Sequence, residues 1–126
     1  MTLQATSEHS DGALAVLEYE VPPSFPGPPL HLHAFDEFFY VLEGELAFRL
    51  GDSAVTLGAG GYVYVPGEEP HTFSNPSAEP GRMLVVRSPG GFEGFFRAVA
   101  ALTAEGGMPD PATMARLNTE HGVTVV

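Results

Sequence analysis

The chain has 126 residues, enough for one domain with a buried core and too few for two. Its net charge is −11, so we expect neither nucleic acid nor an anionic membrane surface as a partner. All five basic residues are arginine and there is no cysteine. Lysine Schiff bases, a P-loop lysine, disulfides and thiolate metal ligands are therefore excluded.

The β-strand signal covers residues 11–88, where glycine and proline separate short apolar segments. The predicted strands are residues 13–21, 31–33, 37–42, 45–50, 53–57, 62–66, 71–75 and 82–88. Residues 22–29 are predicted to form an extended loop, because proline cannot donate to a sheet ladder. Short turns after residues 42 and 50 predict two adjacent antiparallel hairpins. We expect an all-β fold, either a double-sheet jelly roll or a small barrel.

The character of the sequence changes after residue 90, where the spacing becomes helical. Apolar side chains at three- and four-residue spacing predict an amphipathic helix over residues 92–105. Asp110 and Pro111 predict the start of a second helix that runs to about Glu120. The helices are expected to pack on the outer surface of the β core, with a lid over the functional site as the alternative.

The whole chain is expected to form a single domain. Residues 1–90 would be its β core and residues 91–126 a helical appendage of that core. The first residues lack a secretory signal, and no apolar stretch approaches the roughly 18 residues of a membrane span. We therefore expect a cytoplasmic protein.

The strongest functional signal lies in residues 31–44. On a regular strand, one face would carry His31, His33, Phe35, Glu37, Phe39 and Val41. A bend near residues 34–36 would re-aim Glu37. A carboxylate buried among aromatic side chains needs a cation or hydrogen bonds, and a metal ion would satisfy it together with the histidines. With His71 as a fourth donor, the set suits Fe, Mn, Ni, Cu or Zn.

Two further groups of residues are candidates for contact with a substrate. Phe39, Val41 and Phe73 are predicted to form an apolar wall beside the metal. The cations of the β region are Arg49, Arg82 and Arg87. One of these arginines inside the core would bind a substrate carboxylate or enolate, but ion pairing at the surface is the expected role.

Two stretches resemble the sequence motifs of the cupin superfamily. The first has the form HxH-x3-E-x6-G, and the second G-x5-P-x4-H-x3-N. The matching residues are His31, His33, Glu37 and Gly44, then Gly60, Pro66, His71 and Asn75. Gly27 lies closer to the first histidine than the family pattern has it, and Gly67 stands one place early with Glu68 at the usual glycine position.

The resemblance implies a six- to eight-stranded cupin jelly-roll barrel with one metal site within residues 31–75. The implied ligands are His31, His33, Glu37 and His71. Pro66 and Asn75 would be structural. A single copy of each motif resembles a small bacterial monocupin of the quercetin-dioxygenase-like type, and cupins commonly pair into homodimers.

The predicted function is that of a metal-dependent enzyme with one divalent transition ion per chain. A dioxygenase acting on a small aromatic or enolisable molecule is the favoured interpretation. Glu37 would be a ligand and also the catalytic proton acceptor, with its pKa raised by burial. The alternatives are an isomerase or cyclase that works without O2, and a small-molecule-binding cupin without catalysis, because one fold hosts many activities.

Overall fold

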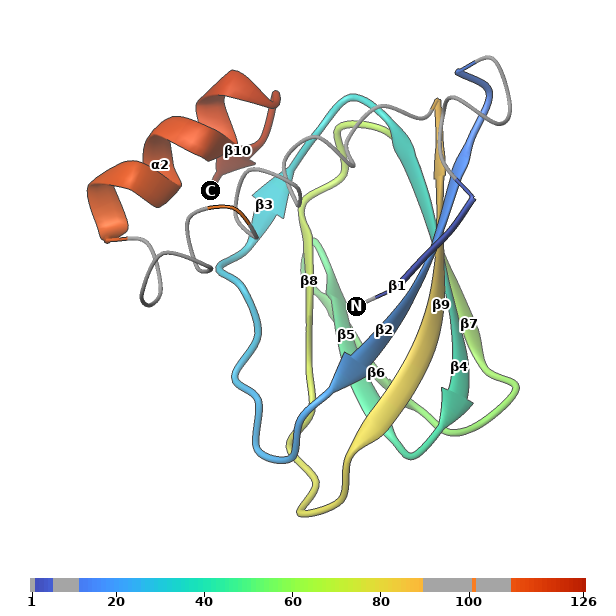
Figure 1. Cartoon of the computed structure of the whole chain (residues 1–126). Coiled ribbons are helices and arrows are strands. Elements are labelled where there is room, and N and C mark those ends of the chain that lie inside the picture. Colours follow the sequence, from blue (N-terminus) through green and yellow to red (C-terminus); the bar gives the residue numbers. More distant parts are fainter. Residues whose placement is uncertain (1, 6–11, 90–100, 102–109) are drawn as a thin grey trace.

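The computed structural model describes residues 2–5, 12–89, 101 and 110–126. Its strands form two five-stranded antiparallel sheets that face each other (Figure 1). The first sheet has, in spatial order, β1 Thr2–Ala5, β2 Ala15–Val21, β9 Gly81–Ser88, β4 Asp36–Glu43 and β7 Tyr62–Val65. The second has β10 Thr124–Val125, β3 His31–Leu32, β8 His71–Ser74, β5 Leu46–Leu50 and β6 Ser53–Leu57. This arrangement agrees with the predicted jelly roll, and it consists of two hydrogen-bonded sheets rather than one closed barrel.

The core lies between the sheets and is built from alternate residues of the strands. In β4 the buried residues are Glu37, Phe39 and Val41, so the predicted alternation holds there. Apolar side chains from β2, β7 and β9 join them from the same sheet, and Leu46 and Phe48 come from β5 opposite. The glutamate is thus carried into an apolar interior by the periodicity of its strand.

One of the two predicted hairpins is present and the other is wrong. β5 and β6 pair across the turn at Gly51, as expected. β4 does not pair with β5, because the two strands lie in opposite sheets and β4 pairs with β7 and β9. Gly44 has φ +79°, and a Cβ there would lie 2.9 Å from the carbonyl oxygen of Pro80. The chain crosses between the sheets at this close contact, which only glycine permits.

The segments predicted as strands at residues 31–33 and 37–42 form two separate strands. β3 and β4 belong to different sheets, and the bend between them occupies residues 33–35. Strands β1 and β10 were not predicted, since their short segments carry little periodicity. Asn75, expected to be structural, is fully buried, and its amide donates to the carbonyls of Val21, Pro22 and Glu79.

The helix α2 Pro111–Glu120 begins as predicted, with the Asp110 carboxylate accepting a hydrogen bond from the Thr113 N–H at 2.7 Å. β10 follows it and pairs with β3, so the end of the chain extends the second sheet. The predicted helix over 92–105 lies outside the described residues, apart from Ala101. Among the described helices, none is long and apolar enough to span a membrane.

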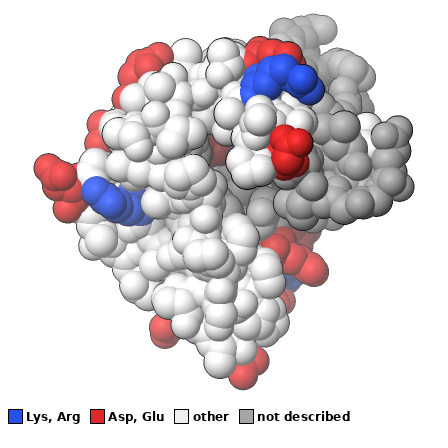
Figure 2. All heavy atoms as spheres, turned by 90° about the vertical axis from the view of Figure 1, so that its left-hand side faces the viewer, with Lys and Arg blue, Asp and Glu red and all other residues white. Residues whose placement is uncertain are grey.

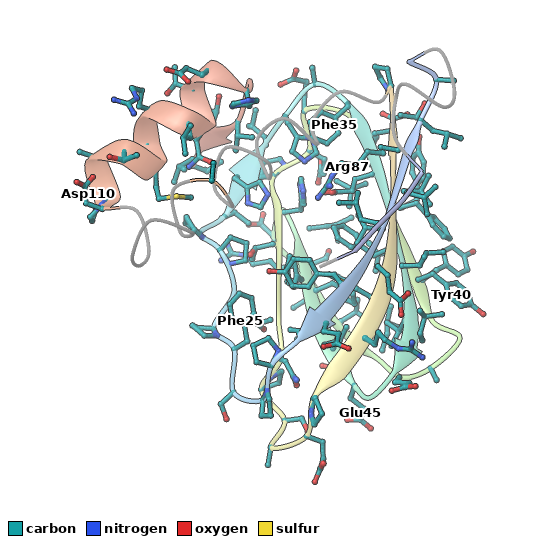
Figure 3. The ribbon with its side chains drawn as sticks, in the orientation of Figure 1. Phe25, Phe35, Tyr40, Glu45, Arg87 and Asp110 are labelled. Carbon is teal, nitrogen blue, oxygen red and sulfur yellow. The ribbon has the colours of Figure 1, made fainter. Side chains whose placement is uncertain are left out.

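Charged side chains are spread unevenly over one face of the described part of the chain. On the face shown in Figure 2, acidic side chains lie mainly around the margin and leave an uncharged centre. Tyr40 lies on the side of the molecule opposite to the face in Figure 2, and its side chain points away from the sandwich (Figure 3).

Candidate metal centre

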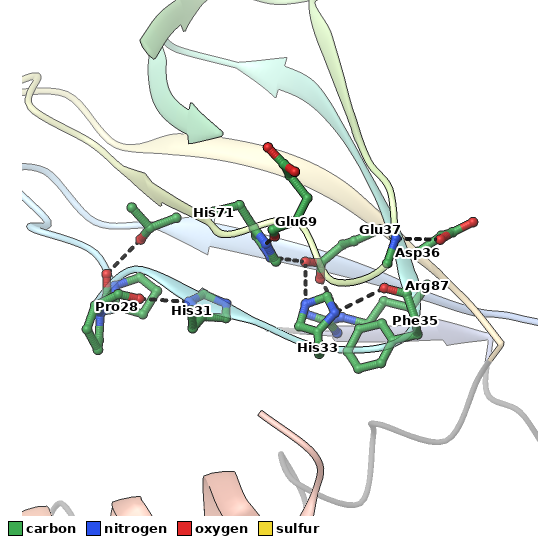
Figure 4. A network of polar contacts seen from close by, with 12 residues as sticks. Pro28, His31, His33, Phe35, Asp36, Glu37, Glu69, His71 and Arg87 are labelled. Carbon is green, nitrogen blue, oxygen red and sulfur yellow. Dashed lines mark hydrogen bonds and ion pairs between the residues drawn. The ribbon is translucent and has the colours of Figure 1, made fainter. Parts of the chain in front are cut away.

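The predicted ligands converge from both sheets at one end of the sandwich. His31 lies on β3 and His71 at the start of β8, where the two residues are direct cross-strand partners. His33 follows β3 in the bend. Glu37 reaches them from β4 in the facing sheet (Figure 4). The structure therefore brings together all four residues, although a bend interrupts the regular strand on which the expected common face depended.

The three imidazoles share one hydrogen-bonding arrangement. Each Nδ1 donates to a backbone carbonyl two residues away: Pro29 at 2.7 Å for His31, Phe35 at 3.0 Å for His33 and Glu69 at 2.8 Å for His71. Because a carbonyl oxygen only accepts, each Nδ1 must carry the hydrogen. This fixes the ring orientation and leaves Nε2 as the nitrogen that can bind a metal ion, the arrangement typical of metal-ligating histidines. One donor atom from each ring lies within 4.8 Å of the others, so the histidines are placed to hold a metal ion.

Glu37 completes the set of donors through one oxygen. Its Oε1 lies 3.0 Å from His71 Nε2 and 3.3 Å from His33 Nε2. Neighbouring ligands of an octahedral ion with bonds of about 2.1 Å are about 3 Å apart, so these separations fit a shared ion. His33, Glu37 and His71 are buried, whereas His31 is partly exposed. The fit supports a four-donor site in which His31 is the least buried donor.

Arg87 is a site residue whose role the sequence interpretation missed. It lies on β9 directly opposite Glu37, is 9% exposed, and its Nε donates to Glu37 Oε2 at 2.5 Å. The expectation of surface pairing is wrong for Arg87, though it is right for Arg82, which pairs with Glu18 and Glu43. Alternation from buried Met83 would have placed Arg87 inside, but the other face of β9 is also apolar and hides this signal.

The electrostatics of Glu37 also differ from the expectation. Burial raises the pKa of its carboxyl, but the Arg87 guanidinium and the neighbouring imidazoles of His33 and His71 outweigh burial and hold the pKa well below its usual range. The predicted raised pKa is therefore wrong. Burial lowers the pKa of His31, which favours the neutral imidazole that a metal requires.

The bend at residues 33–35 is held by the loop that carries the second motif. The Glu68 N–H donates to the His33 carbonyl at 2.7 Å, and the Gly67 N–H donates to Asp36 Oδ1 at 2.8 Å. A Cβ at Gly67 would lie 2.3 Å from the Ala34 carbonyl oxygen. Gly67, the glycine displaced from its usual place in the second motif, thus allows the loop to pack closely against the bend that carries His33.

The predicted pocket residues lie beside and below the donors. The ring centroid of Phe39 is 6.3 Å from that of His71 and 6.0 Å from that of Phe73. Val41 is fully buried one position further along the inner face of β4. Phe35 stacks on the His33 ring at 3.6 Å with nearly parallel planes. Their role as a substrate wall stays a prediction.

Comparisons with known proteins agree with this architecture. Residues 17–87 match the family model of the cupin domain. The solved structure of TT1209 from Thermus thermophilus is 28% identical, with a TM-score of 0.58 over 70% of this chain and 84% of that one. No curated protein matches significantly.

Two structures of proteins with a stated activity are also similar, each with 28% identity. The polyketide cyclase RemF from Streptomyces resistomycificus has a TM-score of 0.60 over 68% of this chain and 61% of that one. The DMSP lyase DddQ from Ruegeria pomeroyi has a TM-score of 0.55 over 61% and 39%. This chain covers less than two thirds of either protein. The match over residues 17–87, with the motifs placed at one end of the sandwich, shows that the chain belongs to the cupin family.

Proposed function

We propose that the protein is an enzyme that holds one divalent transition ion through Nε2 of His31, His33 and His71 and Oε1 of Glu37. The observation that carries this proposal is the shared orientation of the three imidazoles, each fixed by a backbone carbonyl. Fe, Mn, Ni, Cu and Zn all suit these donors. A bound ion would supply Lewis acidity and, where redox-active, reactivity towards O2.

The favoured activity is that of a dioxygenase acting on a small aromatic or enolisable molecule. The partly exposed side chain of His31 would give such a molecule access to the donors. Phe39 and Phe73 would shield the reacting atoms from water. Glu37 remains the candidate catalytic carboxylate, but its lowered pKa makes it a weak proton acceptor. We therefore assign it the role of an ionised ligand that orients the reacting group.

An isomerase or cyclase that works without O2 is the second candidate. The similarity to a polyketide cyclase and to a DMSP lyase supports it. A binding protein without catalysis is the remaining alternative. All three candidates would bind a small organic molecule. They differ in whether this molecule is converted and whether O2 is consumed.

The metal content of the purified, untagged protein tests the site. We expect about one ion per chain in the wild type and a large loss in His31→Ala and His71→Ala, because each removes a ligand. His121→Ala is the matched control, since the ring of His121 binds the Leu117 carbonyl of α2. Full metal content in both ligand variants would show that the site is assigned wrongly.

Turnover then separates the candidate activities. Oxygen uptake with flavonols, diketones or catechols is expected for a dioxygenase. Turnover under anaerobic conditions, including with Zn, would favour the isomerase or cyclase. A wild type that binds the ligand without turning it over, and a Glu37→Gln variant that keeps this affinity, would identify a binding protein.

We also propose that the protein is a homodimer in which the outer face of β4 and β7 contacts a second copy. Tyr40, Tyr62 and Tyr64 are exposed there by 37%, 64% and 53%. Aromatic residues of this kind are enriched in protein interfaces. β7 is the outermost strand of its sheet among the described residues, and the same face of a second copy, related by a two-fold axis, would complement this face.

A further inference from the structure

The carboxylate of Glu37 is divided between two kinds of partner. Oε1 faces the imidazoles, 3.0 Å from His71 Nε2 and 3.3 Å from His33 Nε2. Oε2 accepts a hydrogen bond from Arg87 Nε at 2.5 Å (Figure 4). A carboxylate can bind a metal through one oxygen or through both. The direction of Oε2 therefore decides how many coordination positions Glu37 occupies.

Arg87 is held so that it can fix this direction. Its backbone lies opposite Glu37 in the register of β4 and β9, and its side chain enters the space between the sheets (Figure 3). The guanidinium carbon lies 6.0 Å from the ring centroid of Phe35, and that ring stacks on His33. Arg87 thus contacts the site from the strand next to Glu37, through its hydrogen bond to that carboxylate.

We propose that Arg87 is a positioning residue that makes Glu37 a single-oxygen ligand. A charge-assisted hydrogen bond of this kind is among the strong ones, so rotating Oε2 towards the ion would sacrifice it. Three imidazoles and one oxygen leave positions of an octahedral ion open for water and a small molecule. This inference rests on the proposed metal site and adds the residue that keeps those positions open.

The geometry requires an arginine rather than any cation. The donor is Nε, which lies within the side chain, while a lysine presents its charge only at the tip of a flexible stem. Arg87→Lys should therefore retain the charge but not the direction of the hydrogen bond. Arg87→Gln removes the charge and keeps a polar group of moderate size.

The test uses Co(II) as the probe, because its visible absorption intensity changes with coordination number. We would load the wild type, Arg87→Gln and Arg87→Lys, and measure the spectrum and the Co(II) affinity by competition with a chelator. Both variants should change the spectrum. Arg87→Gln should also bind Co(II) roughly tenfold more weakly, which is the usual effect of losing a residue that hydrogen-bonds to a metal ligand. Arg82→Gln, on the same strand but paired at the surface, should match the wild type.

The outcomes distinguish this inference from the proposed function. If the wild type binds Co(II) and folded Arg87→Gln has the same spectrum and affinity, Arg87 has no positioning role and the metal site stands. If Arg87→Gln does not fold, Arg87→Lys decides in the same way. If the wild type itself binds no Co(II), the proposed metal site fails and this inference fails with it.

Discussion

At the scale of single residues, Gly27 links the proline-rich loop to the candidate metal centre. Its φ is +84°, and a Cβ there would lie 1.8 Å from the Phe73 carbonyl oxygen. The next residue, Pro28, accepts a hydrogen bond from the Thr72 hydroxyl at 2.6 Å. The loop then reaches Pro29, whose carbonyl orients the His31 ring. Because Gly27 has no side chain, the loop can follow this path to His31, the first of the candidate ligands.

Replacing Gly27 with alanine should lower the free energy of unfolding by more than about 2 kcal/mol, because the clash adds to the backbone strain. Gly12→Ala is the matched control, since its φ is +82° and a Cβ there meets nothing within 4 Å. We expect the control to lose only about 1 kcal/mol. Urea unfolding followed by circular dichroism measures both. Equal losses would show that backbone conformation alone matters at Gly27.

At the scale of elements, the sequence predicts strands better than it predicts their partners. The alternation in β4 and the Asp110 cap of α2 are local signals, and the structure confirms both. The turn at Gly44 is compatible with a hairpin or with a crossing between sheets, and only the packing against Pro80 decides. β10 has two residues and is defined by its partner β3, so no local pattern reveals it.

The site shows the same division between local and non-local signals. The two motifs identify the four residues that the structure brings together. The role of Arg87 cannot be predicted from the sequence, because its partner is 50 residues away and apolar residues lie on both faces of its strand. The lowered pKa of Glu37 could not be predicted for the same reason, since the guanidinium of Arg87 is the main cause of the lowering.

The pairing of β10 with β3 leads to a prediction about the end of the chain. Val125 lies opposite His31, and the Val126 N–H donates to the Leu30 carbonyl at 2.9 Å. Deleting residues 124–126 should weaken metal binding several-fold by freeing the backbone of β3, while the core between the sheets persists. Calorimetric titration with a divalent metal and circular dichroism measure the two effects.

A substituted chain serves as the control for this deletion. Thr124→Val together with Val125→Thr keeps the backbone hydrogen bonds and exchanges only the exposed side chains. It should bind metal like the wild type. Undiminished binding by the shortened chain would mean that β3 is held in place without β10.

At the scale of the whole molecule, the outer face of β4 and β7 carries the prediction about assembly. Tyr62→Arg combined with Tyr64→Arg should convert a dimer into a monomer, because like charges would meet across the two-fold axis. Light scattering after size-exclusion chromatography measures the mass. Val55→Arg, an exposed apolar position on β6 of the other sheet, is the control and should leave the mass unchanged. A monomeric wild type would refute the proposed dimer.

The position of the donors between the two sheets has a consequence for the abundance of the protein in a cell. An ion bound by histidines of one sheet and Glu37 of the other ties the two halves of the sandwich together. Binding to the folded chain alone adds about 2.7 kcal/mol of stability when the free ion is at a hundred times its Kd. A chain starved of metal would unfold more often and be degraded sooner. The amount of this protein should therefore follow the metal supply, without a dedicated regulator.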